Sequence, residues 1–112
     1  MMNRERLIPL LNEIAQLLQS NGHPGQAEYI SALATVAEWD VTAVEPGLVS
    51  GAIWGGSGSV WDVAQFNSRE ERRRFMHALL RLVDEMRQAG IKAPGAESSA
   101  AIMTSWLTSG II

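Results

Sequence analysis

Apolar residues recur every three or four positions along most of this chain, and this period limits the folds open to it more than any other feature. In residues 4–19 the recurring positions are Leu7, Leu11, Ile14 and Leu18. Such spacing places side chains on one face of a helix, and it returns in residues 26–39 and 69–89. Residues 59–66 are the one candidate for a short extended piece, since no segment alternates apolar and polar side chains over a full strand. The chain is therefore predicted to be all-α.

Helix breakers and capping residues divide the chain into separate helices. Pro9 predicts that the first helix starts near Leu7 or kinks there, because an interior proline loses a hydrogen bond and crowds the preceding turn. Ser68 and Glu71 form a capping box that starts a long helix, and Gly90 favours its end at the preceding residue. The predicted architecture is a compact bundle of four to five helices, with a glycine-rich loop between the first and second halves.

Residues 40–63 interrupt the helical period with a proline, β-branched residues and several glycines. One short helix is predicted there over residues 44–53, and a glycine turn follows it. A last short helix is predicted over residues 98–107. These two segments bring the predicted number of helices to five.

Length and composition limit the chain to one small domain. With 112 residues it can bury a single continuous core, so residues 1–112 are expected to form one helical domain. Its acidic half, with the glycine-rich loop, covers residues 1–66, and the long helix and C-terminal tail cover residues 67–112. The absence of cysteine excludes disulfides and thiolate chemistry and fits a reducing cytosol. Glu13 interrupts the best apolar run, so neither a signal peptide nor a membrane span is predicted, and a cytoplasmic location is expected.

The residue spacing of this sequence does not match catalytic or metal-binding motifs. Residues 55–59, GGSGS, lack the final glycine of a nucleophile elbow and the lysine of a phosphate-binding loop. His23 and His77 have no second histidine or carboxylate at metal-ligand spacing. We therefore expect no enzyme activity, no cofactor and no bound metal. A small enzyme or ligand-binding domain around Ser59, Asp62 and His77 is the last-ranked alternative, because spacing pairs no nucleophile with a base.

Charge is divided unevenly between the two halves. Residues 1–66 hold two basic and seven acidic side chains, a net charge of −5, whereas residues 67–112 hold seven basic and five acidic ones, a net charge of +2; the sum is −3. Trp39, Trp54 and Trp61 lie in or beside the most acidic and glycine-rich part of the first half. Rigid aromatic side chains beside carboxylates suit protein recognition, while packing in the core is the alternative for each tryptophan.

The glycine-rich segment also carries a family resemblance. Residues 53–62, IWGGSGSVWD, place an aromatic residue before Gly-Gly-x-Gly-Ser, a hydrophobic residue after it, and an acid two positions further on. This motif, which follows two amphipathic helices, resembles the signature of a family of small all-α bacterial proteins. The resemblance covers residues 7–66 in layout and is specific over Trp54–Asp62, where Trp61 replaces an expected small polar residue. Members of that family look like companions of secreted toxins, which implies an immunity protein that binds a cognate toxin domain and blocks its active site.

The partner site predicted from charge and aromatic content has two tryptophan anchors, Trp39 and Trp54. The other members of this site are Glu38, Asp40, Glu45, Trp61 and Asp62. An acidic face of this kind mimics a polyanion and steers into the basic cleft of a toxin that acts on nucleic acid or nucleotides.

The glycine-rich loop itself is expected to be structural. Its members are Gly55, Gly56, Gly58 and Ser59. Glycines permit positive φ angles, and the side chains of Ser59 and Asp62 are expected to accept main-chain N–H groups of the turn or to cap a following turn. An anion-binding nest of amides and direct contact with a partner are the alternatives.

A rival function uses the basic side chains of the second half. These are Arg69, Arg72, Arg73, Arg74, Arg81 and Arg87. A regulator could bind nucleic acid or an acidic protein through them. The acidic total lowers the attraction for phosphate, so the leading prediction is a protein partner, with no nucleic acid, membrane or metal.

Overall fold

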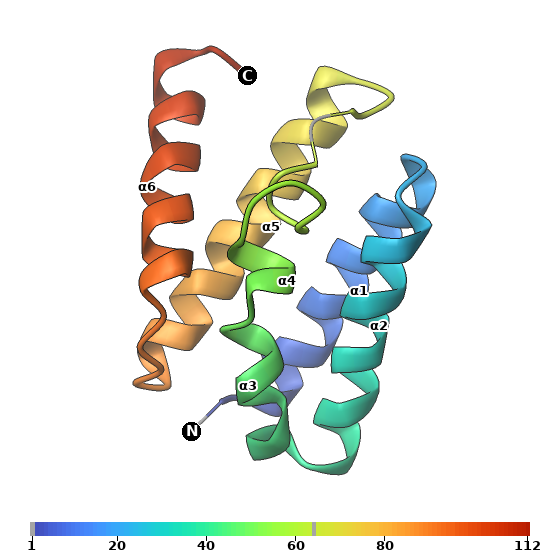
Figure 1. Cartoon of the computed structure of the whole chain (residues 1–112), viewed down its shortest axis with the longest axis vertical. Coiled ribbons are helices and arrows are strands. Elements are labelled where there is room, and N and C mark those ends of the chain that lie inside the picture. The colour runs from blue at the N-terminus through green and yellow to red at the C-terminus, as the bar shows by residue number, and fades with distance from the viewer. Residues whose placement is uncertain (1, 64) are drawn as a thin grey trace.

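The computed structural model describes residues 2–63 and 65–112, and all regular secondary structure in these ranges is helical (Figure 1). The long helices are α1 (Arg4–Ser20), α2 (Pro24–Trp39), α5 (Arg69–Gln88) and α6 (Pro94–Ser109). Single turns fill the middle of the chain: the 3-10 helix η1 (Val41–Val44), α3 (Glu45–Leu48) and α4 (Gly51–Trp54). The all-α class is confirmed, but the described residues form six α-helices and a 3-10 helix rather than four to five helices.

Helix α1 starts earlier than Pro9 led us to expect. The Asn3 side chain accepts a hydrogen bond of 3.1 Å from the Arg6 main-chain N–H, and this N-cap starts the helix at Arg4. Pro9 lies inside the helix, where its ring leaves the main-chain oxygen of Glu5 without an intrahelical donor. Both residues are exposed, so water can satisfy that oxygen.

The single helix predicted over residues 44–53 is replaced by short turns. Ser50 caps α4, because its hydroxyl oxygen accepts the Ala52 N–H at 3.0 Å. A new N-cap at this position ends the preceding turn and starts another. Local capping therefore divides a segment whose apolar spacing alone would allow one helix.

Helix α5 confirms the predicted boundaries. The Ser68 hydroxyl oxygen accepts the Glu71 N–H at 3.1 Å at the start of the helix. At its end, Gly90 has a φ of +76°, and the Ile91 N–H donates to the Met86 main-chain oxygen at 2.9 Å. This is the left-handed ending that glycine permits.

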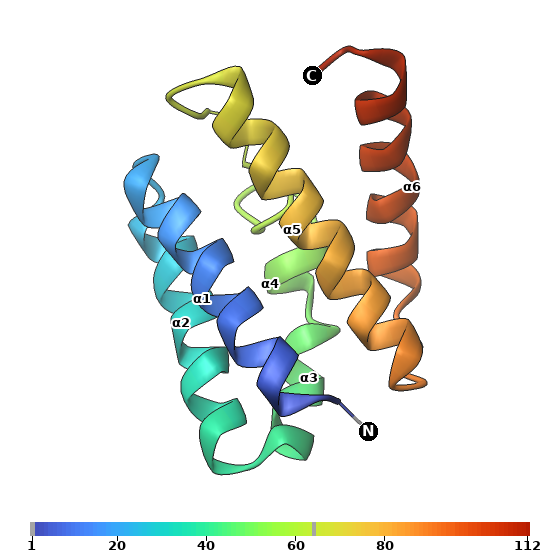
Figure 2. The ribbon, with the colours of Figure 1, turned by 180° about the vertical axis from the view of Figure 1, so that it is seen from behind.

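Helix α6 begins at Pro94, four residues before the predicted residue 98. Proline fits the first turn of a helix, because an N–H group there would have no intrahelical acceptor and its absence loses no hydrogen bond. Figures 1 and 2 show α6 at the edge of the molecule, where it packs against α5 and α4. Within the described residues, no helix is both long and apolar enough to cross a membrane.

The core lies where α1, α2 and α5 meet, and the short helices cover it. Helices α1 and α2 are antiparallel neighbours, and α1 also packs on α5 (Figures 1 and 2). The largest fully buried side chains include Leu7, Leu11, Ile14 and Leu18 of α1, Ile30 of α2, and Phe75, Leu79 and Leu82 of α5. The predicted apolar faces of these three helices are therefore the faces that form the core.

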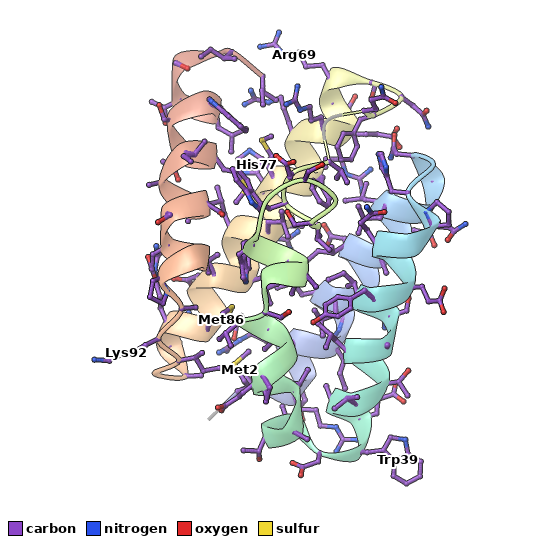
Figure 3. All side chains as sticks on the ribbon, viewed as in Figure 1. Met2, Trp39, Arg69, His77, Met86 and Lys92 are labelled. Carbon is purple, nitrogen blue, oxygen red and sulfur yellow. The ribbon has the colours of Figure 1, made fainter. Side chains whose placement is uncertain are left out.

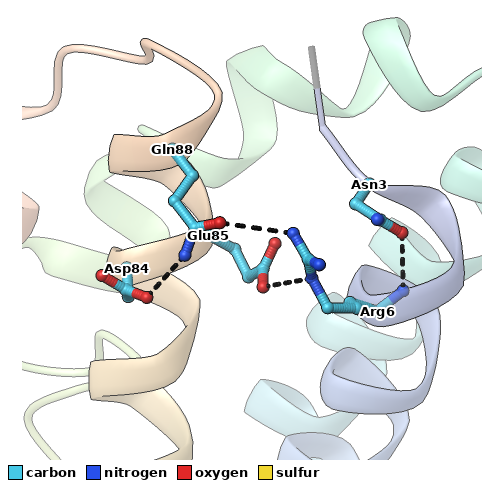
Figure 4. A network of polar contacts seen from close by, with 5 residues as sticks. All are labelled: Asn3, Arg6, Asp84, Glu85 and Gln88. Carbon is cyan, nitrogen blue, oxygen red and sulfur yellow. Dashed lines mark hydrogen bonds and ion pairs between the residues drawn. The ribbon is translucent and has the colours of Figure 1, made fainter.

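Ion pairs join α1 to α5 across the two halves of the chain. Arg6 Nε lies 2.7 Å from Glu85 Oε1 and Arg6 also donates to Gln88 (Figure 4). Arg81 Nη2 lies 2.6 Å from Glu13 Oε2. Each pair joins an acid of one half to a base of the other, so these four charges neutralise one another between α1 and α5, while the net charges of the two halves stay at −5 and +2.

A third ion pair closes the turn between α5 and α6. Arg87 Nη2 lies 2.5 Å from Glu97 Oε1, and these hydrogen bonds lower the pKa of the Glu97 carboxyl and raise the pKa of Arg87. A carboxyl with a lowered folded-state pKa favours folding above its unfolded pKa, and this contribution is lost as the pH falls through the folded value.

We expect the carboxyl of Glu97 to titrate at a lower pH than an ordinary glutamate in an NMR pH titration, because of its contact with Arg87. The substitution Arg87→Gln should bring its pKa back to that of an ordinary glutamate. Identical titrations in the two proteins would contradict the assignment.

Candidate functional site

The C-terminal end of α2 carries the most exposed aromatic side chain of the described residues. Trp39 is 87% exposed and projects away from the body of the protein in Figure 3. Val36, one helical turn earlier, is 37% exposed, and residues three apart on a helix are neighbours on its surface. Glu38 and Asp40 flank Trp39 in the chain and are also exposed. We call Val36, Glu38, Trp39 and Asp40 the Trp39 corner.

The main chain of the Trp39 corner is held by specific contacts. The Asp40 N–H donates to the Val36 main-chain oxygen at 2.9 Å, and Asp40 Oδ1 accepts the Thr42 N–H at 3.0 Å. The Arg4 guanidinium donates to the Glu38 main-chain oxygen. The main chain around Trp39 is thus held in place before binding, which lowers the conformational entropy lost when a partner covers the ring.

Glu45 lies close by in the chain but in a different setting. It is half-buried at the start of α3 and lines a shallow groove whose other wall includes Ile91 and Lys92. The carboxylate therefore belongs to the boundary between α3 and the turn after α5.

Trp54 belongs to the core, which corrects its predicted role as an anchor. It is only 7% exposed, and its Nε1 donates to the Leu48 main-chain oxygen at 2.6 Å. Helix α6 covers it closely, because a Cβ added at Gly95 would lie 3.3 Å from Trp54 Cβ. A partner cannot reach this indole without displacing part of the fold.

Trp61 and Asp62 lie apart from both of these places. The Trp61 ring stacks on Trp106 of α6, with centroids 6.2 Å apart and an interplanar angle of 21°, and it is half-buried. Asp62 is exposed, and its side chain has no hydrogen bond to any other described residue. The predicted site is therefore divided among the Trp39 corner, the groove that Glu45 lines, the core and the loop beside α6.

Residues 55–63 pass through turns and bends between α4 and α5, and the Gly55 main-chain oxygen organises them. It accepts hydrogen bonds of 2.9 Å from both the Ser59 hydroxyl and Trp61 Nε1. A Cβ at Gly55 would overlap the Gly51 main-chain oxygen, so this close approach requires glycine.

Two expectations for the glycine-rich loop need correction. Ser59 donates a hydrogen bond and does not accept an amide, and Asp62 fastens no described part of the loop. Among Gly55, Gly56 and Gly58, only the last has a positive φ, of +87°. The N–H groups of Gly55 and of residues 59–61 donate to main-chain oxygens, whereas those of residues 56–58 donate to no main-chain oxygen of the described residues. The anion-binding nest therefore stays an alternative for residues 56–58 alone.

Most arginines of the second half form hydrogen bonds or ion pairs with other parts of the chain. Arg69 donates to the Gly110 main-chain oxygen at 3.0 Å, and Arg73 donates to the Ile112 main-chain oxygen. Arg81 and Arg87 form the ion pairs described above. These contacts weaken the case for an arginine surface that binds phosphate.

The enzyme alternative gains no support from the geometry. Ser59 is buried and bonded to main chain, whereas Asp62 is exposed on the same loop and His77 is exposed on α5. The described residues hold no cluster of three histidine, cysteine or carboxylate side chains positioned for a metal.

No protein-family model, curated protein or solved structure matches the chain. The resemblance of the loop motif to immunity proteins therefore stays a prediction.

Sequence reasoning missed Val36 as a member of the site, although the helical spacing of α2 contained a usable signal. Val36 and Trp39 are three residues apart, and both fall outside the apolar stripe of α2 that includes Ile30, Ala34 and Ala37.

Proposed function

We propose that this chain is an immunity protein, which binds a cognate bacterial toxin domain through the Trp39 corner and occludes the active site of the toxin. The observation that carries this proposal is the 87% exposure of Trp39 between two exposed carboxylates. Burying an aromatic side chain of this size contributes more to association than almost any other residue, and tryptophan is enriched among binding hot spots.

The charges of the Trp39 corner support a basic partner. Glu38 and Asp40, the chain neighbours of Trp39, carry exposed carboxylates, and the Asp40 carboxylate is fixed by its contact with Thr42. A toxin that acts on nucleic acid or nucleotides needs a cationic cleft, and fixed carboxylates accelerate encounter with such a cleft. The motif over residues 53–62 supports the toxin as the kind of partner, while the corner supplies the contact surface.

The direct test is co-expression with the toxic C-terminal domain encoded by a neighbouring gene for a secreted protein. We expect the toxin domain to co-purify with this chain and to lose its toxicity in the same cells. If the two proteins neither co-purify nor restore growth, or if no such gene lies beside this one, the proposal is wrong.

A pair of charge reversals tests the steering by the Trp39 corner. Glu38→Lys removes an exposed carboxylate beside Trp39, whereas Glu28→Lys makes the same change in charge at an exposed position earlier on α2. We expect Glu38→Lys to lower the association rate by about threefold to tenfold at low salt, because local charge steers encounter. Surface-binding kinetics at several salt concentrations measure this, and equal rates for the two variants would contradict steering through the corner.

A further inference from the structure

The turn between α1 and α2 contains an asparagine followed by a glycine. The chain has four asparagines, and only Asn21 precedes a glycine. Such a pair is prone to deamidation, because glycine has no Cβ to hinder the attack of its main-chain nitrogen on the asparagine side chain. The sequence therefore places one reactive amide at this turn.

The reaction needs water but no oxidant, reductant or enzyme. The Gly22 main-chain nitrogen attacks Cγ of Asn21, so a new N–Cγ bond forms while the Cγ–Nδ2 bond breaks. The amide leaves as ammonia and takes up the proton that the Gly22 nitrogen loses, which produces a five-membered succinimide ring. Water then opens the ring at either carbonyl carbon. The product is an aspartate or an isoaspartate at position 21.

The fold blocks the first step of this reaction. Asn21 is only 8% exposed, its Nδ2 donates to the Leu17 main-chain oxygen at 2.7 Å, and its Oδ1 accepts the Asn67 N–H at 2.6 Å. Ring closure requires the Gly22 nitrogen to lie on the same side of the Cα–C bond as the Asn21 Cβ. The ψ of 15° at Asn21 turns that nitrogen towards the main-chain nitrogen of Asn21 instead. The two atoms that must bond are therefore held apart.

We propose that Asn21 is a deamidation site that the fold protects and that reacts when the turn between α1 and α2 separates from residues 65–67. Two further contacts hold these segments together. Asn67 Nδ2 donates to the Ser20 main-chain oxygen at 3.0 Å, and His23 Nε2 lies 2.6 Å from the Gln65 main-chain oxygen. A reaction confined to an opened form proceeds in proportion to the population of that form. Deamidation of Asn21 thus marks chains in which this contact has opened.

The modification also prevents the contact from re-forming fully. In the aspartate product an oxygen replaces Nδ2 opposite the Leu17 main-chain oxygen, so a donor is lost and a carboxylate enters a buried place. The isoaspartate product lengthens the main chain next to Gly22, whose φ is +82°. A chain modified in either way opens more often than an intact one, and the change is irreversible.

The rate of deamidation in the folded and unfolded protein tests the protection. The intact chain is incubated at one mildly alkaline pH with and without guanidinium chloride, and each asparagine is followed by peptide mass spectrometry. We expect Asn21 to react at least about 10-fold more slowly in the folded protein. Asn12, which precedes Glu13, should react more slowly than Asn21 in guanidinium chloride. Asn21 rates within about twofold of each other in the two conditions, or no faster than Asn12 when unfolded, overturn the proposal.

Asn67→Ala tests whether residues 65–67 control the opening. This change removes the donor to the Ser20 oxygen and leaves Asn21 and Gly22 unaltered. We expect the Asn21 rate in the folded protein to rise by about threefold or more, with no change in guanidinium chloride. Asn12→Ala, at an exposed position of α1, should leave both rates unchanged. A folded-state rate in Asn67→Ala equal to that of the unchanged protein would overturn control by residues 65–67.

Asn21→Asp tests the consequence of the modification, because it has the side chain of one product. It should lower Tm by about 5 °C or more, or leave the chain unfolded. Asn12→Asp adds the same charge at an exposed position and should change Tm by no more than about 3 °C. Equal Tm values for the two variants, measured by circular dichroism, would show that deamidation does not disturb the turn and would overturn this part of the proposal.

Discussion

Replacing Trp54 by alanine is expected to lower the free energy of unfolding by about 3–5 kcal/mol. The indole is 7% exposed, and its Nε1 donates to the Leu48 main-chain oxygen at 2.6 Å. Its removal leaves a cavity in place of the buried ring and leaves the Leu48 main-chain oxygen without its donor. Urea denaturation followed by far-UV circular dichroism measures the change.

Trp54→Phe separates the two contributions at this position. Phenylalanine keeps an aromatic ring in the buried site but has no N–H for the Leu48 oxygen. We expect an intermediate loss of about 1–3 kcal/mol, which is the usual cost of an unpaired buried polar group. A loss below about 0.5 kcal/mol for Trp54→Ala, the range of ordinary surface substitutions, would show that Trp54 is not a core residue in solution.

Replacing Trp39 by alanine is expected to weaken binding of the toxin domain while leaving the stability of the fold nearly unchanged. Its ring is 87% exposed, so the free energy of unfolding should change by no more than about 0.5 kcal/mol. Binding to the toxin domain should weaken by about 30-fold or more, because a central tryptophan anchor contributes about 2 kcal/mol or more to an interface. Isothermal titration calorimetry with the purified toxin domain measures the affinity.

Two controls make the Trp39 result specific. Ile111→Ala removes another strongly exposed apolar side chain from a distant element and should leave affinity for the toxin domain unchanged. Trp39→Phe should keep part of the affinity for the toxin domain, since a smaller aromatic ring still buries part of the apolar surface that the indole buries. Unchanged affinity in Trp39→Ala would show that the partner binds elsewhere on the molecule.

Features of the fold that depend on neighbours in the chain were predictable. The N-cap at Ser68 and the left-handed Gly90 define α5 through contacts within a few residues, and both are confirmed, whereas the reciprocal capping-box contact of the Glu71 side chain is not among the hydrogen bonds of the described residues. Of the two alternatives at Pro9, a start near Leu7 is wrong, because α1 starts at Arg4 after the Asn3 cap and Pro9 lies inside the helix. The middle of the chain was missed because the cap at Ser50 overrides a continuous apolar period.

The candidate site was less predictable, because composition groups residues that the fold separates. Trp39, Trp54 and Trp61 share acidic and glycine-rich surroundings in the sequence, yet only the first is strongly exposed. Its position gave a usable signal, since the buried Ile30, Ala34 and Ala37 of α2 define an apolar stripe that excludes residue 39. The settings of the other two depend on α6, which approaches them from the far end of the chain.

The sequence by itself determined the all-α class, the faces of α1, α2 and α5 that form the core, and the boundaries of α5. Those features follow from a 3.6-residue period and from caps, which act within one or two turns. Only the tertiary structure decided which tryptophan a partner can reach and which charges are cancelled by ion pairs. The burial of Trp54 and Trp61 and the pairing of charges depend on contacts between segments distant in the sequence, such as Glu13 with Arg81, and no local spacing encodes them.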